Sequence, residues 1–297
     1  MCRIFIPVLL CITLHSYAQT AGTTSVEYTN EIDAWHQKRV SSLKSENGWL
    51  NVSGLYWLKE GTNTLGSGAA NDIVFPAGRA DEKIGEVILK DSIVSVRFYE
   101  GVNVTTNGLL FKEGVIYGGS KEKPVILSHR NLRWFIIKRG NKYGIRLRDL
   151  ESESLKNFTH IDRYAVDKKW QVLATYEAPR ENQTIPIHDV IGLTTATPFG
   201  GTLHFEIEGK KYKLDATLEG DDLFIVFSDS TNGHDTYGGG RFLYAKRPVE
   251  GNTVALDFNK AYNPPCCFTN YATCPLPPVQ NRLSVAVTAG EKVYGHH

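Results

Sequence analysis

The strongest constraint on the fold of this chain is an alternation of apolar and polar side chains with a period of two residues. In the stretch KYGIRLR, Tyr143, Ile145 and Leu147 alternate with Lys142 and Arg146. The stretches GTLHFEIE and KWQVLATYE repeat the pattern farther along the chain. Because successive side chains of a strand point to opposite faces, this period indicates half-buried antiparallel strands.

Other short apolar runs are rich in β-branched and aromatic residues, and loops such as GSGAAND and NGHD separate them. The runs are SIVSVRF, RWFIIK, DLFIVFS and LSVAV. Many short strands at close spacing are typical of all-β sheets that stack or close on themselves. We therefore predict a mainly β protein with antiparallel sandwich or barrel sheets.

One segment near the amino terminus shows a different period. Val26, Trp35 and Leu43 belong to a run of large residues at roughly helical spacing, which neither Gly nor Pro interrupts. Ser25 precedes this run and suits a helix N-cap. The pattern predicts one helix within a segment over residues 19–47.

The charged stretch DLESESLKN follows the alternating strand KYGIRLR and marks the clearest internal boundary of the chain. Polar stretches without periodicity are typical of connections between sheets. We predict a β subdomain over residues 48–150. A second, C-terminal β subdomain over residues 151–297 carries a Gly-rich and a Pro/Cys-rich stretch.

Residues 1–18 have the features of a secretory signal peptide. Arg3 precedes an apolar run of about 11 residues, which is shorter than the roughly 20 residues of a membrane-spanning helix. Ser16 and Ala18 supply the small residues of a cleavage site. We therefore predict cleavage after Ala18, export to the periplasm or the extracellular space, and no membrane span in the mature protein.

The charges of the chain are balanced. It has 33 basic and 32 acidic residues, a formal net charge of +1, and removal of Arg3 with the signal peptide leaves equal numbers. No basic patch stands out, so the sequence argues against nucleic acid or an anionic membrane as a partner. The oligomeric state and the ligand stay open at this stage.

Three of the five cysteines and five of the 12 prolines lie in the stretch DFNKAYNPPCCFTNYATCPLPP, residues 257–278. In an oxidising compartment, three cysteines imply one disulfide and one remaining thiol. A catalytic thiolate is the alternative, and it needs a nearby His or cation that lowers its pKa. No His lies between residues 235 and 295, so only the fold could supply such a group. The C-C-x6-C spacing does not fit a zinc site, and we predict neither a metal nor a cofactor.

The Gly-rich stretch SDSTNGHDTYGGGRF, residues 228–242, contains three consecutive glycines that allow close backbone approach. It matches neither G-x-G-x-x-G nor a phosphate-binding P-loop. A long hairpin loop is one interpretation. In the other, the stretch forms the rim of a site. There Asp229, Asp235 and His234 act in acid–base chemistry, and Arg241 binds a carboxylate or phosphate.

The strand RFLYAK places Arg241 on the same face as Leu243 and Ala245. An arginine on an apolar face lies either at the rim of a sheet or paired inside a barrel. If this strand forms a hairpin with VALDFN across the turn at residues 250–252, Arg241 lies near Asp257. Such a pair is equally compatible with a structural and a functional role.

Several stretches together carry a resemblance to a known family. They are GWL and GLYWL at residues 48–58, YGIR at 143–146, TYGGGRFL at 236–243, DFN at 257–259, and the Pro/Cys-rich stretch through NRL at 281–283. With them the chain resembles the DUF1684 family of bacteria and archaea, whose function is unknown. The resemblance covers nearly all of the mature chain but implies no activity.

The resemblance also bears on the cysteines. Cys267 stands where the family pattern has Ala or another small residue, which implies that Cys267 is the odd thiol. We therefore predict a disulfide between Cys266 and Cys274, which closes a short loop and stabilises the fold by roughly 2.5 kcal/mol.

A weaker resemblance concerns GTNTLGSGAANDIVFP, residues 61–76, which is similar to a forkhead-associated domain. Such domains bind phosphothreonine and need an Arg directly after the first Gly of this motif. Here Ser67 follows Gly66, and the later Ser-x-x-His is missing. The resemblance thus implies a related sheet geometry but argues against phosphopeptide binding.

The sequence favours an exported protein that binds a small or polymeric ligand at a site in its C-terminal half. The predicted ligand-binding residues are Tyr237, Arg241, Asp257, Asn259, Tyr262 and Asn263. The alternative is a hydrolase with Arg241 as an anion clamp. Its candidate catalytic residues are Asp229, His234 and Asp257.

Overall fold

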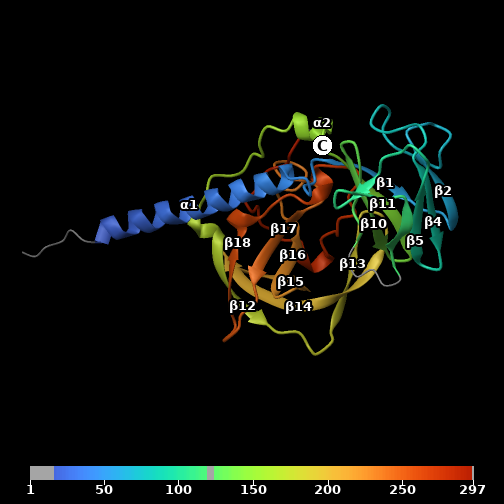
Figure 1. Ribbon diagram of the computed structural model, residues 1–297. Coiled ribbons are helices and arrows are strands. Elements are labelled where there is room, and N and C mark those ends of the chain that lie inside the picture. The colour runs from blue at the N-terminus through green and yellow to red at the C-terminus, as the bar shows by residue number, and fades with distance from the viewer. Residues whose placement is uncertain (1–16, 119–123, 296–297) are drawn as a thin grey trace, which may run out of the picture.

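The computed structural model describes residues 17–118 and 124–295, with side chains from Ser25 onward. The predicted signal peptide lies outside this part, apart from the backbone of its last two residues, so its cleavage stays a prediction. The long helix α1 (Tyr17–Lys44) projects from a β-rich body at its amino-terminal end (Figure 1). Its second half packs on the body through buried Ile32 and Leu43. None of the helices described is long and apolar enough to cross a membrane.

The first half of the chain forms two sheets that pack on each other. One has the order β1-β11-β10-β9-β6-β7 and the other the order β3-β2-β4-β5-β8. Their bounds are β1 (Val52–Trp57), β2 (Gly61–Gly66), β3 (Ile73–Val74), β4 (Gly85–Lys90), β5 (Ile93–Phe98), β6 (Thr105–Thr106), β7 (Leu109–Leu110), β8 (Glu113–Tyr117), β9 (Leu127–His129), β10 (Leu132–Arg139) and β11 (Lys142–Asp149). Trp134, Phe75 and Phe98 meet edge to face in the core between these sheets.

The second half forms one strongly curved antiparallel sheet. Its order is β17-β16-β15-β14-β12-β18, with β13 paired to β14, and the terminal strands β17 and β18 approach each other so that the sheet nearly closes. The bounds are β12 (Gln171–Glu177), β13 (Thr184–His188), β14 (Thr194–Ile207), β15 (Lys210–Glu219), β16 (Asp222–Phe227), β17 (Arg241–Lys246) and β18 (Thr253–Asp257). The prediction of a mainly β protein with antiparallel sandwich or barrel sheets and one N-terminal helix is confirmed.

Short helices complete the fold. They are α2 (Glu153–Lys156) and the 3₁₀ turns η1 (Lys168–Trp170), η2 (Phe258–Lys260), η3 (Pro265–Cys267) and η4 (Val279–Asn281). One predicted pairing is wrong. The strands β17 and β18 do not form a hairpin across residues 250–252, because β17 is hydrogen-bonded to β16 and β18 to β12.

The inner face of the curved sheet is buried, and its outer face is covered at β16 and β17. Leu223, Ile225 and Phe227 of β16 point into the sheet's core, whereas Phe224 and Val226 point outward. The Pro/Cys-rich stretch lies over this outer face and also contacts the first half of the chain. Arg139 Nε, for example, donates a hydrogen bond to Thr273 Oγ1 at 2.9 Å. This arrangement creates a junction between the two halves and α1.

Candidate functional site

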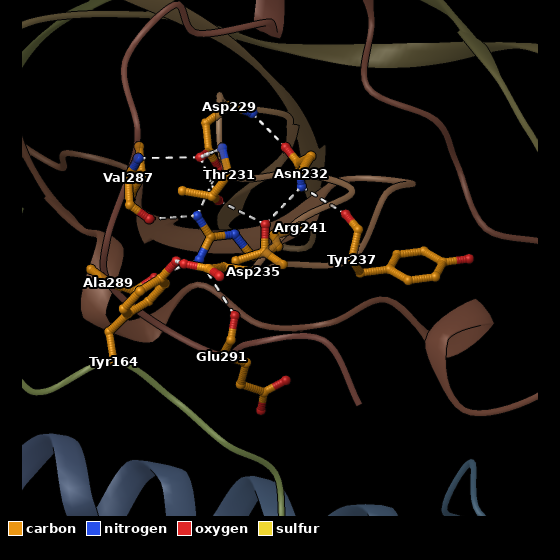
Figure 2. A network of polar contacts seen from close by, with 11 residues as sticks. Tyr164, Asp229, Thr231, Asn232, Asp235, Tyr237, Arg241, Val287, Ala289 and Glu291 are labelled. Carbon is orange, nitrogen blue, oxygen red and sulfur yellow. Dashed lines mark hydrogen bonds and ion pairs between the residues drawn. The ribbon is translucent and has the colours of Figure 1, made fainter. Parts of the chain in front are cut away.

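Arg241 is fully buried and paired with groups of the protein (Figure 2). Its Nη2 donates to Asp229 Oδ2 at 2.7 Å and to the Val287 carbonyl at 2.9 Å, and Nη1 donates to the Ala289 carbonyl. Asp229 also accepts hydrogen bonds from Thr231. The interpretation of an arginine paired inside a barrel is thus confirmed. The network connects the Gly-rich stretch to the last segment of the chain, and neither Asp229 nor Arg241 is exposed to a ligand.

Asp257 has a different partner from the one expected. Its Oδ1 accepts a hydrogen bond from Tyr28 Oη of α1 at 2.8 Å and another from the Asn259 backbone at 3.1 Å. The predicted pair between Arg241 and Asp257 is therefore wrong. Although β17 and β18 approach each other, the two side chains lie on different faces. Arg241 faces the core on the side of Leu243, whereas Asp257 follows the core residue Leu256 and points outward, toward Tyr28. Asp257 instead connects α1 to the β-rich body through its hydrogen bond with Tyr28.

The other predicted site residues do not converge on one place. Asn259 and Asn263 are buried and bond to protein groups, with Asn263 N donating to Glu291 Oε2 at 2.7 Å. His234 is exposed on the Gly-rich stretch, and Tyr237 is half-buried there. Tyr262 is the exception among the predicted ligand-binding residues, because it lines a cavity at the junction of the two halves.

This cavity has a volume of about 410 Å³ and lies between α1, the first sheet and the outer face of β16 and β17. We call it the arginine cavity. Its lining includes Arg39, Trp49, Arg139, Tyr244, Tyr262 and Cys274. The volume falls within the usual range for small-molecule sites. Within the described part of the chain, no cluster of three or more His, Cys, Asp or Glu side chains is placed to hold a metal ion.

Two arginines form part of the cavity wall. Arg39 of α1 lies with its guanidinium carbon 4.6 Å from the centre of the Tyr262 ring. It also donates to the Asn263 carbonyl at 2.9 Å and forms an ion pair of 3.4 Å with buried Glu291. Arg139, at the end of β10, bonds to Thr273 and to its neighbouring backbone, and no ion pair is found for it among the described residues.

A third arginine, Arg146 of β11, lies against this wall and is only 5% exposed. Its guanidinium carbon is 5.0 Å from the centre of the Trp49 ring. No described residue accepts a hydrogen bond from Arg146 Nε or Nη2. Burial, together with the like charges of Arg139 and Arg148, lowers the pKa of Arg146 to about 10. A buried and largely unneutralised positive charge therefore stands beside the cavity.

Aromatic rings form the opposite wall. Tyr244 and Tyr262 are stacked, with ring centres 6.3 Å apart and an interplanar angle of 10°. Glu219 accepts a hydrogen bond from Tyr244 Oη at 2.5 Å. Burial and this contact raise the pKa of Tyr244. These residues add flat apolar surfaces and one carboxylate to the lining of the cavity.

Cys274 of the Pro/Cys-rich stretch lines the cavity, and Cys266 is its hydrogen-bonded neighbour. Cys266 N donates to Cys274 Sγ at 3.1 Å, and both residues are thiols in this structure. A side-chain hydrogen bond between the two cysteines and the charge of Arg146 lower the pKa of Cys266. The same side-chain hydrogen bond and burial raise the pKa of Cys274. The fold thus supplies the nearby cation that the local sequence lacks. The Cys266–Cys274 disulfide stays a prediction.

Sequence analysis missed Arg39, Arg139 and Trp49 as site residues and treated Arg146 as part of a polar strand face. The alternation in KYGIRLR correctly indicated two faces. The alternation could not show that the second half of the chain covers the charged face of this strand. The available signal was the run of Arg146 and Arg148 on a strand with apolar flanks.

Comparison with known proteins identifies no activity. The family model described as a protein of unknown function, DUF1684, matches residues 156–292. No curated protein matches the chain. The NMR structure of an uncharacterised protein of Haloarcula marismortui is 31% identical to it, covers 47% of this chain and 80% of its own, and has a TM-score of 0.40.

Two structures of forkhead-associated domains are also similar to the chain. One is the FhaA domain complexed with the intracellular domain of Rv3910, and the other comes from a study of phosphothreonine-dependent interactions. Each is 15% identical to this chain and covers 32% of it, with a TM-score of 0.22. The matched part makes up 97% of the first structure's chain and 92% of the second's. The family match, which includes the Gly-rich and the Pro/Cys-rich stretches, shows that the chain belongs to the DUF1684 family.

Proposed function

We propose that this protein binds a small anionic ligand, with a carboxylate or phosphate group, in the arginine cavity. The observation that carries this proposal is Arg146, a buried arginine with two unpartnered nitrogens beside a cavity. Burying a charge without a partner costs several kcal/mol. A bound anion next to Arg139 offsets that cost by adding a negative charge, since neither Arg139 nor Arg146 forms an ion pair with a described carboxylate.

The arginines have separate roles in this proposal. Arg139 lines the cavity and has no carboxylate partner among the described residues, so it is the group that contacts the anion. Its planar guanidinium can donate two parallel hydrogen bonds to a carboxylate or phosphate. Arg146 acts through the wall, because its charge raises the positive potential of the cavity. Arg39, already paired with Glu291, mainly positions Tyr262.

Binding can be tested by calorimetry and thermal unfolding with acetate, benzoate and inorganic phosphate. We expect at least one of these anions to raise the melting temperature, and Arg139→Gln to abolish the increase. The matched control is Arg133→Gln on the same strand, since Arg133 donates only to backbone carbonyls near itself. No shift with any anion, or equal shifts in Arg139→Gln and the wild type, would contradict the proposal.

The hydrolase alternative gains no support from the site. None of Asp229, His234 and Asp257 lines the arginine cavity. We also retain export as a proposal, which rests on the signal-like residues 1–18. Amino-terminal sequencing of the mature protein tests it, with Gln19 expected as the first residue and an intact Met1 as the contrary result.

A further inference from the structure

We propose that the anionic ligand is an amphiphile whose apolar tail occupies a second cavity beside the arginine cavity. This inference rests on the anion site proposed above. The second cavity has a volume of about 240 Å³ and is lined mainly by apolar side chains. We call it the apolar cavity. It shares Glu219, Phe224 and Pro275 with the arginine cavity, so the two are neighbours on the outer face of the curved sheet.

The apolar cavity lies between this face and the arm formed by β13 and β14. Ile185 and Ile187 alternate along β13 and line one side, and Val226 lies on the other. The arm is held over the Pro/Cys-rich stretch by backbone hydrogen bonds from Leu276 to His188 and from Val190 to Cys274. The same stretch therefore contributes to both cavities.

The polar groups in this lining are already bonded to the protein. Asp215 accepts hydrogen bonds from Thr202 at 2.7 Å and from Gln280 at 3.0 Å. Asn281 accepts from the Asp215 backbone at 2.7 Å and donates to the Val226 carbonyl at 2.8 Å. Because these groups are satisfied, the cavity offers an occupant chiefly apolar contact. An alkyl or aryl tail fits it better than a sugar or a peptide.

Phe224 forms the partition between the two cavities. Its ring meets Phe242 edge to face, with centres 4.9 Å apart, and lies 5.0 Å from the ring of Tyr244. A ligand that passes over this ring places its charged end near Arg139 and its tail beside Ile187. An apolar cavity of about 150 Å³ holds benzene. On that scale, the apolar cavity has room for roughly eight to ten carbon atoms.

The test is a series of straight-chain carboxylates from acetate to dodecanoate, measured by calorimetry below their micelle-forming concentrations. Each buried methylene should tighten binding about fourfold, until the gain stops near a tail of roughly eight to ten carbons. Comparing the affinity for octyl phosphate with that for inorganic phosphate tests the effect of the tail with a phosphate head group. The better head group identifies the anion.

A variant in the arm distinguishes the contribution of the tail to binding from that of the anionic head group. In Ile187→Asn the chain-length dependence should disappear, while acetate and phosphate bind as they do to the wild type. Val190→Asn is the matched control, because Val190 is exposed near the tip of the same arm and lines neither cavity. It should leave the whole series unchanged.

Two results would overturn the inference in distinguishable ways. If acetate or phosphate binds but affinity does not rise with chain length, the tail site is wrong and the anion site stands. If octanol binds as tightly as octanoate and Arg139→Gln changes neither affinity, the anion site itself fails, and the inference fails with it.

Discussion

Two buried arginines of this protein have opposite surroundings. Both terminal nitrogens of Arg241 donate to protein acceptors, among them the buried carboxylate of Asp229. Arg146 has Nε and Nη2 without acceptors among the described residues. Burial and the charges of Arg139 and Arg148 lower its pKa, whereas Cys274 and Cys266 raise it. Each arginine has apolar neighbours within its sheet, with Leu243 on the same strand face as Arg241 and Leu55 and Phe135 on the strands that flank Arg146. Burial therefore does not distinguish them, whereas the pairing of the charge does.

The difference separates a structural role from a functional one. A buried charge that is paired with a carboxylate holds segments of the chain together, as Arg241, paired with Asp229, holds the Gly-rich stretch to residues 287–291. An unpaired buried charge reduces stability, and proteins commonly retain such groups at sites of function. The contrast makes predictions that differ in sign and in size.

The largest effect is expected for Arg241→Met. It leaves Asp229 buried without its cation and removes the donor to three backbone carbonyls, so the free energy of unfolding should fall by about 3–5 kcal/mol. Urea unfolding measures this loss. A second variant, Asp229→Asn with Arg241 intact, should also be strongly destabilised. If either variant loses less than about 1 kcal/mol, the structural interpretation of this pair is wrong.

The next effect concerns the two thiols beside Arg146. If Cys266 and Cys274 form a disulfide, the oxidised protein should be more stable than the reduced one by roughly 2.5 kcal/mol. Intact mass after alkylation of the unreduced protein counts the thiols, and peptide mapping locates the bridge. Alkylation of both cysteines without reductant would refute the disulfide. It would also leave the Cys266 thiolate as a partner for Arg146 and so weaken the contrast with Arg241.

A smaller effect is expected for Arg139→Gln. The loss of two charge-assisted hydrogen bonds should weaken binding of the preferred anion by about 1.5–3 kcal/mol, which is roughly 10-fold to 150-fold. Because Arg139 has little to stabilise in the free protein, its unfolding free energy should change by less than about 0.5 kcal/mol. Calorimetry and urea unfolding on the same sample separate the two quantities. A fall in stability without a loss of affinity would make Arg139 a structural residue.

The smallest effect is expected for Glu219→Gln. The carboxylate of Glu219 lies in the wall shared by both cavities and opposes a bound anion. Its neutralisation should tighten anion binding by less than about 1 kcal/mol at moderate salt, because Glu219 is largely solvent-exposed. Competition calorimetry can resolve this change. Weaker binding in the variant would show that the ligand carries a positive group instead.

Local patterns in the sequence account for the type of fold and for the buried place of Arg241. The period of two predicted the strands, and the period near 3.6 predicted α1. The alternation in RFLYAK predicted that Arg241 lies on the apolar face of its strand. Partners could not be derived in this way. Asp229 and Asp257 are both compatible with the strand pattern as the carboxylate partner of Arg241. Only the three-dimensional arrangement shows that the partner is Asp229, 12 residues away in the sequence.

The arginine cavity lay beyond the reach of sequence periodicity for the same reason. Arg39 comes from α1, Arg139 and Arg146 from the first sheet, and Tyr262 from the Pro/Cys-rich stretch. A period of two shows that a strand face is polar but not that another half of the chain covers it. The Pro/Cys-rich stretch singled out from the sequence contributes to this cavity, since Tyr262 and Cys274 both line it.

The most direct test of the contrast is the variant Arg146→Met, measured for unfolding free energy with and without the preferred anion. We predict that the ligand-free variant is as stable as the wild type or more stable by about 1–3 kcal/mol, and that the anion stabilises it much less. Arg148→Met is the control. Arg148 donates to Asn51 Oδ1 at 3.0 Å, so the loss of this arginine should destabilise the protein. A strongly destabilised Arg146→Met that still binds the anion normally would contradict the account.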